Sequence, residues 1–315
     1  IRRFGAVCRT VGGLKSARIG AIGARPAAFQ TVRYSEKILQ ATGITVVPAD
    51  LSEIFAVANS FDVNDVLLKE KLGEIKEYGT IPSKIVDEQI LKQARFSVAV
   101  DNWMKENECV ASAIQCWTSI QSNFGCASCL SMSMMGEKKM PSACEVDVTG
   151  AVSMYTLLLA ADTPPGFLDW NNNYGEEEDK CVNTHCSNFP KSFIGTEPEV
   201  SDLDILGETL GRENCFGAVK GKVAAGPMTY FRVSTDDNKG SLKAYLGEGE
   251  FTDDPFNMDG GIAVCKVPQL RKLLNFICMN GYEHHVAMVR TNVADVISEA
   301  VGKYLGWDLY HHKKK

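Results

Sequence analysis

The sequence predicts an α/β N-terminal domain, a parallel sheet flanked by helices, followed by a β-rich, barrel-like C-terminal domain. Short β-branched runs alternate with amphipathic stretches over residues 1–162, which is the order expected of a mostly parallel sheet. A Pro-Pro-Gly turn at 164–166 then interrupts the chain. Beyond it, short alternating runs are separated by Gly- and Asp-rich turns. We therefore expect two domains, at 1–162 and 163–315.

The elements of the first domain are predicted from hydrophobic spacing and helix signals. The opening residues predict a helix that leads into a strand. The further predictions are strands at 17–22, 44–47 and 96–103, and helices at 29–41, 64–78, 83–94 and 110–121.

The second domain is predicted to be rich in strands. The runs VKGKVAAG, TYFRVST and LKAYLGEG alternate between apolar and polar residues, as strands do, and HHVAMV is expected to be a hydrophobic strand. A closing helix is expected over Val293–Tyr304, and the acidic run at 176–179 is expected to be a solvated loop.

Composition and charge narrow the class of protein. The chain has 315 residues, of which 45% are hydrophobic and 23% charged, the balance of a globular protein. Its net charge of −6 argues against a nucleic-acid-binding surface. Apolar runs are too short to cross a bilayer, so no membrane association is expected. The chain begins at Ile1, so we expect it to start inside a larger protein, and we interpret Lys313–Lys315 as a frayed or cloning-derived tail.

Eleven cysteines occur, an odd number, and several lie inside apolar runs. Free cysteine behaves there as a small hydrophobe, and the pattern favours a reducing, cytoplasmic location over a disulfide framework. Cys181-x3-His185-Cys186 and Cys126-x2-Cys129 each resemble half of a zinc site. Neither is followed by a second ligand pair at finger-like spacing, so no structural zinc is expected.

Two acidic residues are candidates for chemistry. In CEVDV (144–148), alternation on a strand would place Glu145 and Asp147 on one face, at a strand exit where open α/β sheets bind ligands. The alternative is a surface strand with two solvated acids. Asp169 follows the Pro-Pro-Gly turn, and its alternative is ordinary turn chemistry.

Histidines are few, and two of the five are adjacent. The pair His284-His285 opens a hydrophobic strand, so one ring should point inward and the other outward. That pattern fits a metal ligand beside a pocket residue, and equally a half-buried structural histidine. We assign His311 and His312 to the tail. Together, Glu145, Asp169 and the histidine pair predict a divalent-metal site suited to proton transfer on a polyol.

At these residues the sequence resembles the L-fucose isomerase family and, more distantly, L-arabinose isomerase. The similar segments are 23–39, 113–121, SACEVDVTGAVS (142–153), THCSNFP (184–190) and GEFTDDPF (249–256). The resemblance implies a Mn²⁺ ion (or Mg²⁺ or another divalent metal) held by Glu145, Asp169 and His285. By position, His185 matches a further histidine of arabinose isomerase.

The resemblance also implies the wider organisation. The family monomer has two α/β domains and a β-rich third, and this chain matches the second and third. We therefore expect partners: the missing N-terminal domain and further copies of the chain, in a trimer or hexamer.

The function implied is metal-dependent aldose–ketose isomerisation of L-fucose or a related sugar such as D-arabinose, through an enediol. Glu145 and Asp169 would be the acid–base pair. The candidates for contacting the sugar are His185, His284, Gln115 and Trp117. Two alternatives are a catalytically incomplete sugar-binding or assembly relative, and a different metal-dependent enzyme such as a hydrolase.

Overall fold

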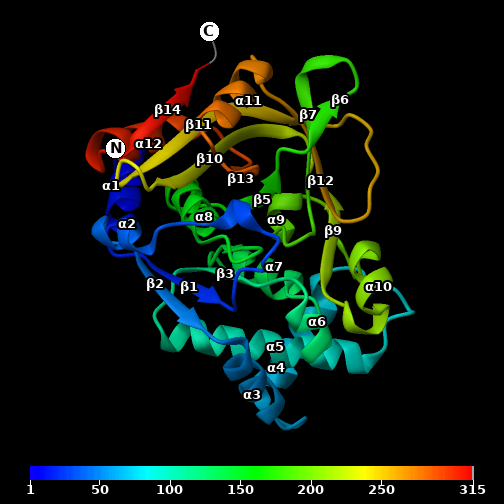
Figure 1. The fold of residues 1–315 in the computed structure, drawn as a ribbon. Helices are drawn as coiled ribbons and strands as arrows, with labels where there is room; N and C mark the ends of the chain where they lie inside the picture. The colour runs from blue at the N-terminus through cyan, green and yellow to red at the C-terminus, as the bar shows by residue number, and fades with distance from the viewer. Residues whose placement is uncertain (314–315) are drawn as a thin grey trace.

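The computed structural model describes residues 1–313 and contains two β-sheets with a buried helix between them (Figure 1). The first sheet has four parallel strands in the order β2-β1-β3-β4. Its strands are β1 (Arg18–Ile22), β2 (Thr45–Ala49), β3 (Ala111–Ile114) and β4 (Ser142–Ala143). Strands β1 and β2 confirm the two short β-branched runs read from the sequence.

Helices cover both faces of this sheet. They are α1 (Arg2–Leu14), α2 (Glu36–Ala41), α3 (Leu51–Ser60), α4 (Val66–Tyr78), α5 (Asp87–Glu106), α6 (Ser119–Asn123), α7 (Cys129–Glu137) and α8 (Val148–Ala161), with the 3₁₀ helix η1 (Gln30–Val32). Asp50 and Asp65 accept hydrogen bonds from the first backbone N–H groups of α3 and α4, which is why these helices begin there. Helices α3, α4 and α5 lie together at the base in Figure 1.

Two predictions in this region are wrong. The strand expected at 96–103 is the second half of α5, a 20-residue helix that is buried from Phe96 to Val100. A helix that is apolar on most sides shows no clear period, so a short β-branched stretch inside it resembles a strand. The helix expected at 110–121 is instead strand β3, with α6 beginning at Ser119. The helix expected at 29–41 is divided into η1 and α2.

The second sheet has ten strands, mostly antiparallel, and confirms the β-rich character of the C-terminal region. Its main path is β5-β13-β10-β11-β12-β7-β6, while β14 pairs with β11 and β9 pairs with β12 and β8. The strands are β5 (Gly166–Asp169), β6 (Asn172–Tyr174), β7 (Glu177–His185), β8 (Glu199–Ser201), β9 (Ala218–Lys222), β10 (Gly226–Asp236), β11 (Ser241–Thr252), β12 (Gly261–Lys266), β13 (His285–Val289) and β14 (Asp308–His312).

This sheet curls, as the barrel-like prediction requires. Strand β5 pairs with β13 at one end of the path, yet it also approaches β7 near the other end. The Asn183 side-chain amide on β7 donates to the Asp169 carbonyl on β5 at 2.7 Å. The ends of β5 and β7 therefore lie side by side, and both carry predicted site residues.

The remaining helices are short. They are α9 (Lys191–Ile194), α10 (Asp204–Leu210), η2 (Arg212–Asn214), α11 (Leu270–Met279), α12 (Ala294–Ile297) and the π-helix η3 (Ser298–Tyr304). The closing helix expected at 293–304 is thus α12 continued by η3. His311 and His312 were assigned to a tail, but they lie in strand β14, and His312 is buried. Of that tail, Lys314 and Lys315 lie outside the described residues.

Helix α8 joins the two sheets into one packed structure. It contacts β3 and β1 of the first sheet and β10 and β13 of the second (Figure 1). Ile19, Val152 and Phe231 belong to the same hydrophobic cluster, which crosses the predicted boundary at residue 162. The division into domains remains a prediction. Among residues 1–313, no helix is both long and apolar enough to cross a membrane.

Candidate active site

Glu145 lies in a strained turn between β4 and α8. Glu145 and Val146 have φ values of 60° and 57°, a region that costs L-residues about 1–3 kcal/mol each. The strand predicted over CEVDV is therefore wrong, because β4 ends at Ala143. The turn separates the two acids, so that Glu145 faces the site while Asp147 becomes the N-cap of α8.

Asp169 and His285 are brought together by strand pairing. They are directly opposed on the antiparallel strands β5 and β13, so their side chains share one face of the sheet. The His285 side chain is fully buried, whereas His284 is 51% exposed. This confirms the prediction of one inward and one outward ring.

The three predicted ligands converge. The His285 Nε2 atom lies 3.4 Å from Glu145 Oε2 and 3.5 Å from Asp169 Oδ1. All three atoms are buried, and none has a hydrogen-bond partner among residues 1–313. The possible metal-ligand groups here are Glu145 with His185 and His285, and Asp169 with His284 and His285. Buried polar atoms are nearly always paired, so unpaired acid oxygens on either side of His285 Nε2 mark a place built for a ligand.

His185 joins this group from the end of β7. Its Nε2 lies 4.0 Å from Asp169 Oδ1, and its ring packs near Phe167 and His285. Burial alone would lower the pKa of His185, but the nearby Asp169 carboxylate raises it to about 10. His185 therefore favours the charged form when the acids around it are charged.

Glu145, on the strained turn, has the opposite tendency and favours its neutral form. Burial raises the pKa of Glu145, and the neighbouring His285 and His185 only partly oppose this effect. In the absence of a cation, Glu145 is thus easier to protonate than an ordinary glutamate.

Asp147 fixes the orientation of His285. Its Oδ2 atom accepts a hydrogen bond from His285 Nδ1 at 2.8 Å, while Oδ1 accepts from the Gly150 backbone N–H at 2.7 Å and from Thr149. A neutral imidazole carries one N–H and one lone pair. With its proton on Nδ1, His285 presents the lone pair of Nε2 to Glu145 and Asp169.

A buried arginine supports Asp147. Arg232 on β10 donates to both carboxylate oxygens of Asp147, at 2.7 and 3.1 Å, and to Glu283 at 3.2 Å. Glu283 in turn accepts from Ser234 at 2.8 Å. Burial would raise the pKa of Asp147, but the charge of Arg232 and the bond to His285 hold it well below its usual value. The sequence placed Asp147 beside Glu145 at an expected strand exit but gave it no specific role, and no local pattern marks Arg232 or Glu283.

This donor set fits a hard divalent cation. Ligands about 2.0–2.1 Å from an octahedral ion are separated by roughly 3 Å, close to the distances at His285 Nε2. Two carboxylate oxygens and one imidazole match Mn²⁺ or Mg²⁺ better than a thiophilic metal.

The predicted sugar contacts lie at different distances from the convergent atoms. His284 Nε2 is 3.8 Å from Asp169 Oδ1, and its Nδ1 lies 3.4 Å from the Thr31 hydroxyl. The Gln115 side chain instead accepts from the Ala24 N–H at 2.9 Å. Trp117 packs near Phe29 and into the core, and its buried indole N–H has no partner among residues 1–313.

An open cavity of about 810 Å³ adjoins the site. Thr31, the contact of His284, and Val146, the neighbour of Glu145, line it. Arg25 and Arg33 also line it, together with Asp237 and Glu283, so the cavity offers two guanidinium groups but carries charges of both signs. Its size is that of a small-molecule pocket.

Comparison with known proteins shows which family the C-terminal part of the chain resembles. Residues 183–313 match the family described as L-fucose isomerase, C-terminal domain. This segment carries His185 and His285, while Glu145 and Asp169 precede it. The C-terminal part of this chain is thus similar to the L-fucose isomerases. The resemblance inferred from the motifs is thereby confirmed.

Curated relatives extend the similarity over most of the chain. It is 29% identical to a sulfoquinovose isomerase of Alkalicoccus urumqiensis over 309 residues, which is 94% of this chain and 66% of that protein. It is 26% identical to one of Priestia aryabhattai over 93% of this chain and 64% of that protein. A third, from a Clostridium species (strain MSTE9), is 25% identical over 90% and 62%. The chain spans just under two thirds of the length of these relatives.

Proposed function

We propose that this chain is a metal-dependent aldose–ketose isomerase that acts through an enediol, with Mn²⁺ as its cation. The convergence of Glu145 Oε2, Asp169 Oδ1 and His285 Nε2, all buried and unpaired, carries this proposal. The relatives named sulfoquinovose isomerase support the same reaction class.

The reaction moves one hydrogen between C1 and C2 of the sugar and another between the two oxygens. A bound divalent cation would supply Lewis-acid polarisation of those oxygens. Proton transfer is the task of Glu145 and Asp169, since each has a second carboxylate oxygen beyond the one directed at His285. The two carboxylates act as a coupled pair.

The surrounding residues keep this pair in position. Asp147 holds the proton of His285 on Nδ1, and Arg232 keeps Asp147 charged. Such outer partners orient a ligand and raise its basicity. His284 stands between the unpaired atoms and Thr31 on the cavity wall, where it can donate to or accept from a sugar hydroxyl.

The substrate we favour is an anionic sugar of the sulfoquinovose type. Sulfoquinovose carries a sulfonate, and Arg25 and Arg33 line the adjoining cavity. Arg33 is exposed and unpaired among residues 1–313, so its guanidinium is free to bind an anion. L-Fucose and D-arabinose carry no charge and would leave this arginine without a partner.

We also propose two kinds of partner for this chain, which are further copies of itself and the remaining domain of the family. A trimer or hexamer in the cytoplasm would complete the open cavity with residues from a neighbouring subunit.

Isotope exchange tests the reaction. The protein carrying this chain is incubated with Mn²⁺ and sulfoquinovose in heavy water, and the ketose is analysed by NMR. Deuterium at the C1 or C2 position indicates an enediol, whereas direct hydride transfer leaves those carbons unlabelled. Glu145→Gln should lower turnover by about 10²–10⁴-fold, the usual contribution of a general acid or base.

The matched control is Glu178→Gln, a change at an exposed acid far along the chain, which should leave turnover unchanged. Retained turnover in Glu145→Gln would refute the assignment. Sugar binding without any turnover by the wild-type protein would favour the incomplete sugar-binding relative.

Substrate charge is tested separately. Arg33→Ala should raise KM for sulfoquinovose by about 10-fold, one charge-assisted contact, and leave kcat nearly unchanged. The same variant should not affect L-fucose. Equal effects on both sugars would exclude a sulfonate contact at Arg33.

A further inference from the structure

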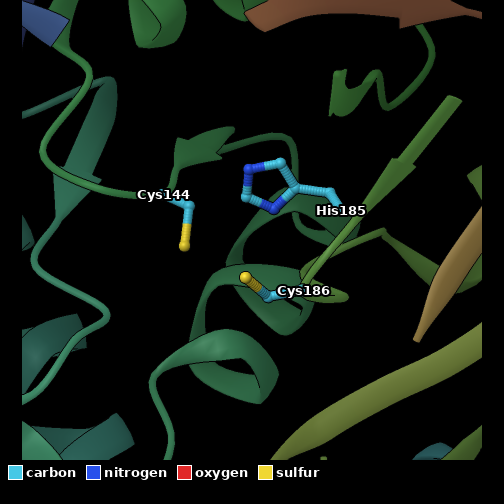
Figure 2. A group of neighbouring side chains, drawn as sticks. All are labelled: Cys144, His185 and Cys186. Atoms are coloured by element: carbon cyan, nitrogen blue, oxygen red, sulfur yellow. The ribbon is translucent and has the colours of Figure 1, made fainter. Parts of the chain in front are cut away.

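Two cysteines and one histidine form a second convergent group beside the proposed active site. One ligand atom from each of Cys144, His185 and Cys186 lies within 4.8 Å of the others (Figure 2). Cys144 follows β4, whereas His185 and Cys186 lie at the end of β7, so two distant segments build the group. His185 and Cys186 belong to one short motif, but no sequence pattern pairs them with Cys144, which is 41 positions away from His185 along the sequence.

One atom of this group is unpaired. His185 is 95% buried, since 5% of its surface is exposed, and no atom of residues 1–313 makes a hydrogen bond to its Nδ1. The other ring nitrogen, Nε2, is directed to Asp169. In Figure 2 both sulfur atoms lie on one side of the His185 ring. A buried polar atom without a partner destabilises the folded protein, and a bound ligand would remove this cost.

We propose that Cys144 Sγ, Cys186 Sγ and His185 Nδ1 form a binding site for one thiophilic cation of the Zn²⁺ or Cd²⁺ class. Thiolate and imidazole ligands select such ions over Mn²⁺ and Mg²⁺. Three protein ligands leave a fourth tetrahedral position for water or for another thiol. Each cysteine releases its proton to solvent as the metal–sulfur bond forms, and charged His185 releases the proton of Nδ1 in the same way as the metal–nitrogen bond forms.

The two sites share His185, and this has a consequence that rests on the proposed function. Neutral imidazole has one N–H and one lone pair. A cation on Nδ1 therefore keeps the proton on Nε2, which lies 4.0 Å from Asp169 Oδ1. That N–H faces the oxygen that the Mn²⁺ site needs and opposes a second cation there. The thiophilic ion and Mn²⁺ should weaken each other's binding, and linkage makes the effect reciprocal.

Cadmium absorbance tests the site without any sugar. The protein, freed of metal and reduced with a phosphine, is titrated with Cd²⁺ while the ultraviolet thiolate-to-metal band is recorded. We expect the band to saturate at one equivalent. Cys144→Ala and Cys186→Ala should each abolish it.

The matched control is Cys126→Ala, which removes a fully buried thiol from the same hydrophobic cluster and should retain the band. A wild-type protein without the band would overturn the proposal, as would a band that persists in both alanine variants or disappears equally in the control. Cadmium NMR on the wild-type protein gives an answer even if the variants do not fold, because an all-oxygen chemical shift would contradict ligation by sulfur.

The coupling between the two cation sites is measured from the electron paramagnetic resonance signal of free Mn²⁺, which gives the Kd for Mn²⁺. One equivalent of Cd²⁺ should raise the Kd for Mn²⁺ by about 5–150-fold, and Cys186→Ala should remove this effect. An unchanged Mn²⁺ affinity would refute the coupling through His185. Absence of Mn²⁺ binding under all conditions would count against the proposed function, whereas absence of the cadmium band counts only against the thiolate site.

Discussion

The two sides of the His285 ring differ in their hydrogen bonding. On the Nδ1 side, Asp147, Arg232 and Glu283 are buried, and each is held by charged hydrogen bonds. On the Nε2 side, Glu145 Oε2 and Asp169 Oδ1 are equally close, yet they have no partner among residues 1–313. Folding leaves such buried atoms unpaired only where something else compensates for the cost. The paired side is therefore the support, and the unpaired side is the face offered to a ligand.

The largest expected effect comes from breaking the paired side at its centre. Arg232→Met removes the partner of Asp147 and leaves two buried acids near each other. We expect a loss of about 3–5 kcal/mol in the free energy of unfolding, the usual cost of an unpaired buried charge. Urea denaturation followed by circular dichroism measures it.

Arg212→Met is the comparison for this change. Arg212 also holds two acids, Asp202 and Asp204, but its side chain is 49% exposed. Solvent screening should limit the loss there to about 1 kcal/mol or less. Equal losses at the two arginines would mean that burial does not distinguish the network around Asp147.

A smaller effect, on the affinity for Mn²⁺, is expected when the hydrogen bond between Asp147 and His285 is weakened. Asp147→Asn retains the shape of the side chain but weakens the bond to His285 Nδ1. Affinity for Mn²⁺ should fall by about 10–100-fold, as is typical for partners of metal ligands. Isothermal titration calorimetry measures this change.

Asp202→Asn provides the matched control, because Asp202 is also a buried acid paired with an arginine. It should leave Mn²⁺ affinity unchanged. If both variants lose affinity to the same extent, general destabilisation rather than orientation of His285 is responsible.

The smallest effect concerns the unpaired side in metal-free protein. Burial raises the pKa of Glu145 in the folded protein. As the pH rises, the Glu145 carboxyl therefore ionises in the unfolded chain, near the usual value of about 4.3, before it ionises in the folded protein. Stability contributed by the neutral acid is therefore lost as the pH rises through the two pKa values. Glu145→Gln cannot ionise, so it should be more stable than wild type near pH 7, and the difference should shrink as the pH falls towards about 4.

Urea midpoints at several pH values, with a chelator present, measure this difference. The exposed Glu178→Gln should show none at any pH. A Glu145→Gln variant that is less stable than wild type at neutral pH would show that the charged carboxylate is already satisfied without a ligand.

Much of the fold could be predicted because its strongest patterns are local. Strands β1, β2 and β13 and helix α4 follow from β-branched runs and amphipathic spacing. The errors arose where burial hides the period. Residues 96–103 continue a helix that is packed on most sides, and 110–121 begins with a four-residue strand that is buried throughout.

The residues of the candidate site also fall into those that the sequence could predict and those that it could not. Glu145, Asp169 and His285 were predicted as ligands because each lies in a recognisable segment. The structure brings both acids close to His285 Nε2, and their role as metal ligands remains a prediction. Arg232 could not, because an arginine in a β-strand normally points to solvent, and its burial depends on Asp147 and Glu283 from two distant segments. The grouping of Cys144 with Cys186 could not be predicted for the same reason, since it arises only from the three-dimensional arrangement.

The alignment of β13 with β5 has a consequence for how this protein tolerates change. His285 stands opposite Asp169 and is buried, whereas its neighbour His284 is half exposed. Because side chains alternate along a strand, a slip of one residue would exchange the two rings. A single deletion or insertion in the loop before β13 would then keep both imidazoles and nearly all of the sequence, and still disconnect the inward ring from Asp147. Substitutions in that loop should be tolerated far better than changes in its length.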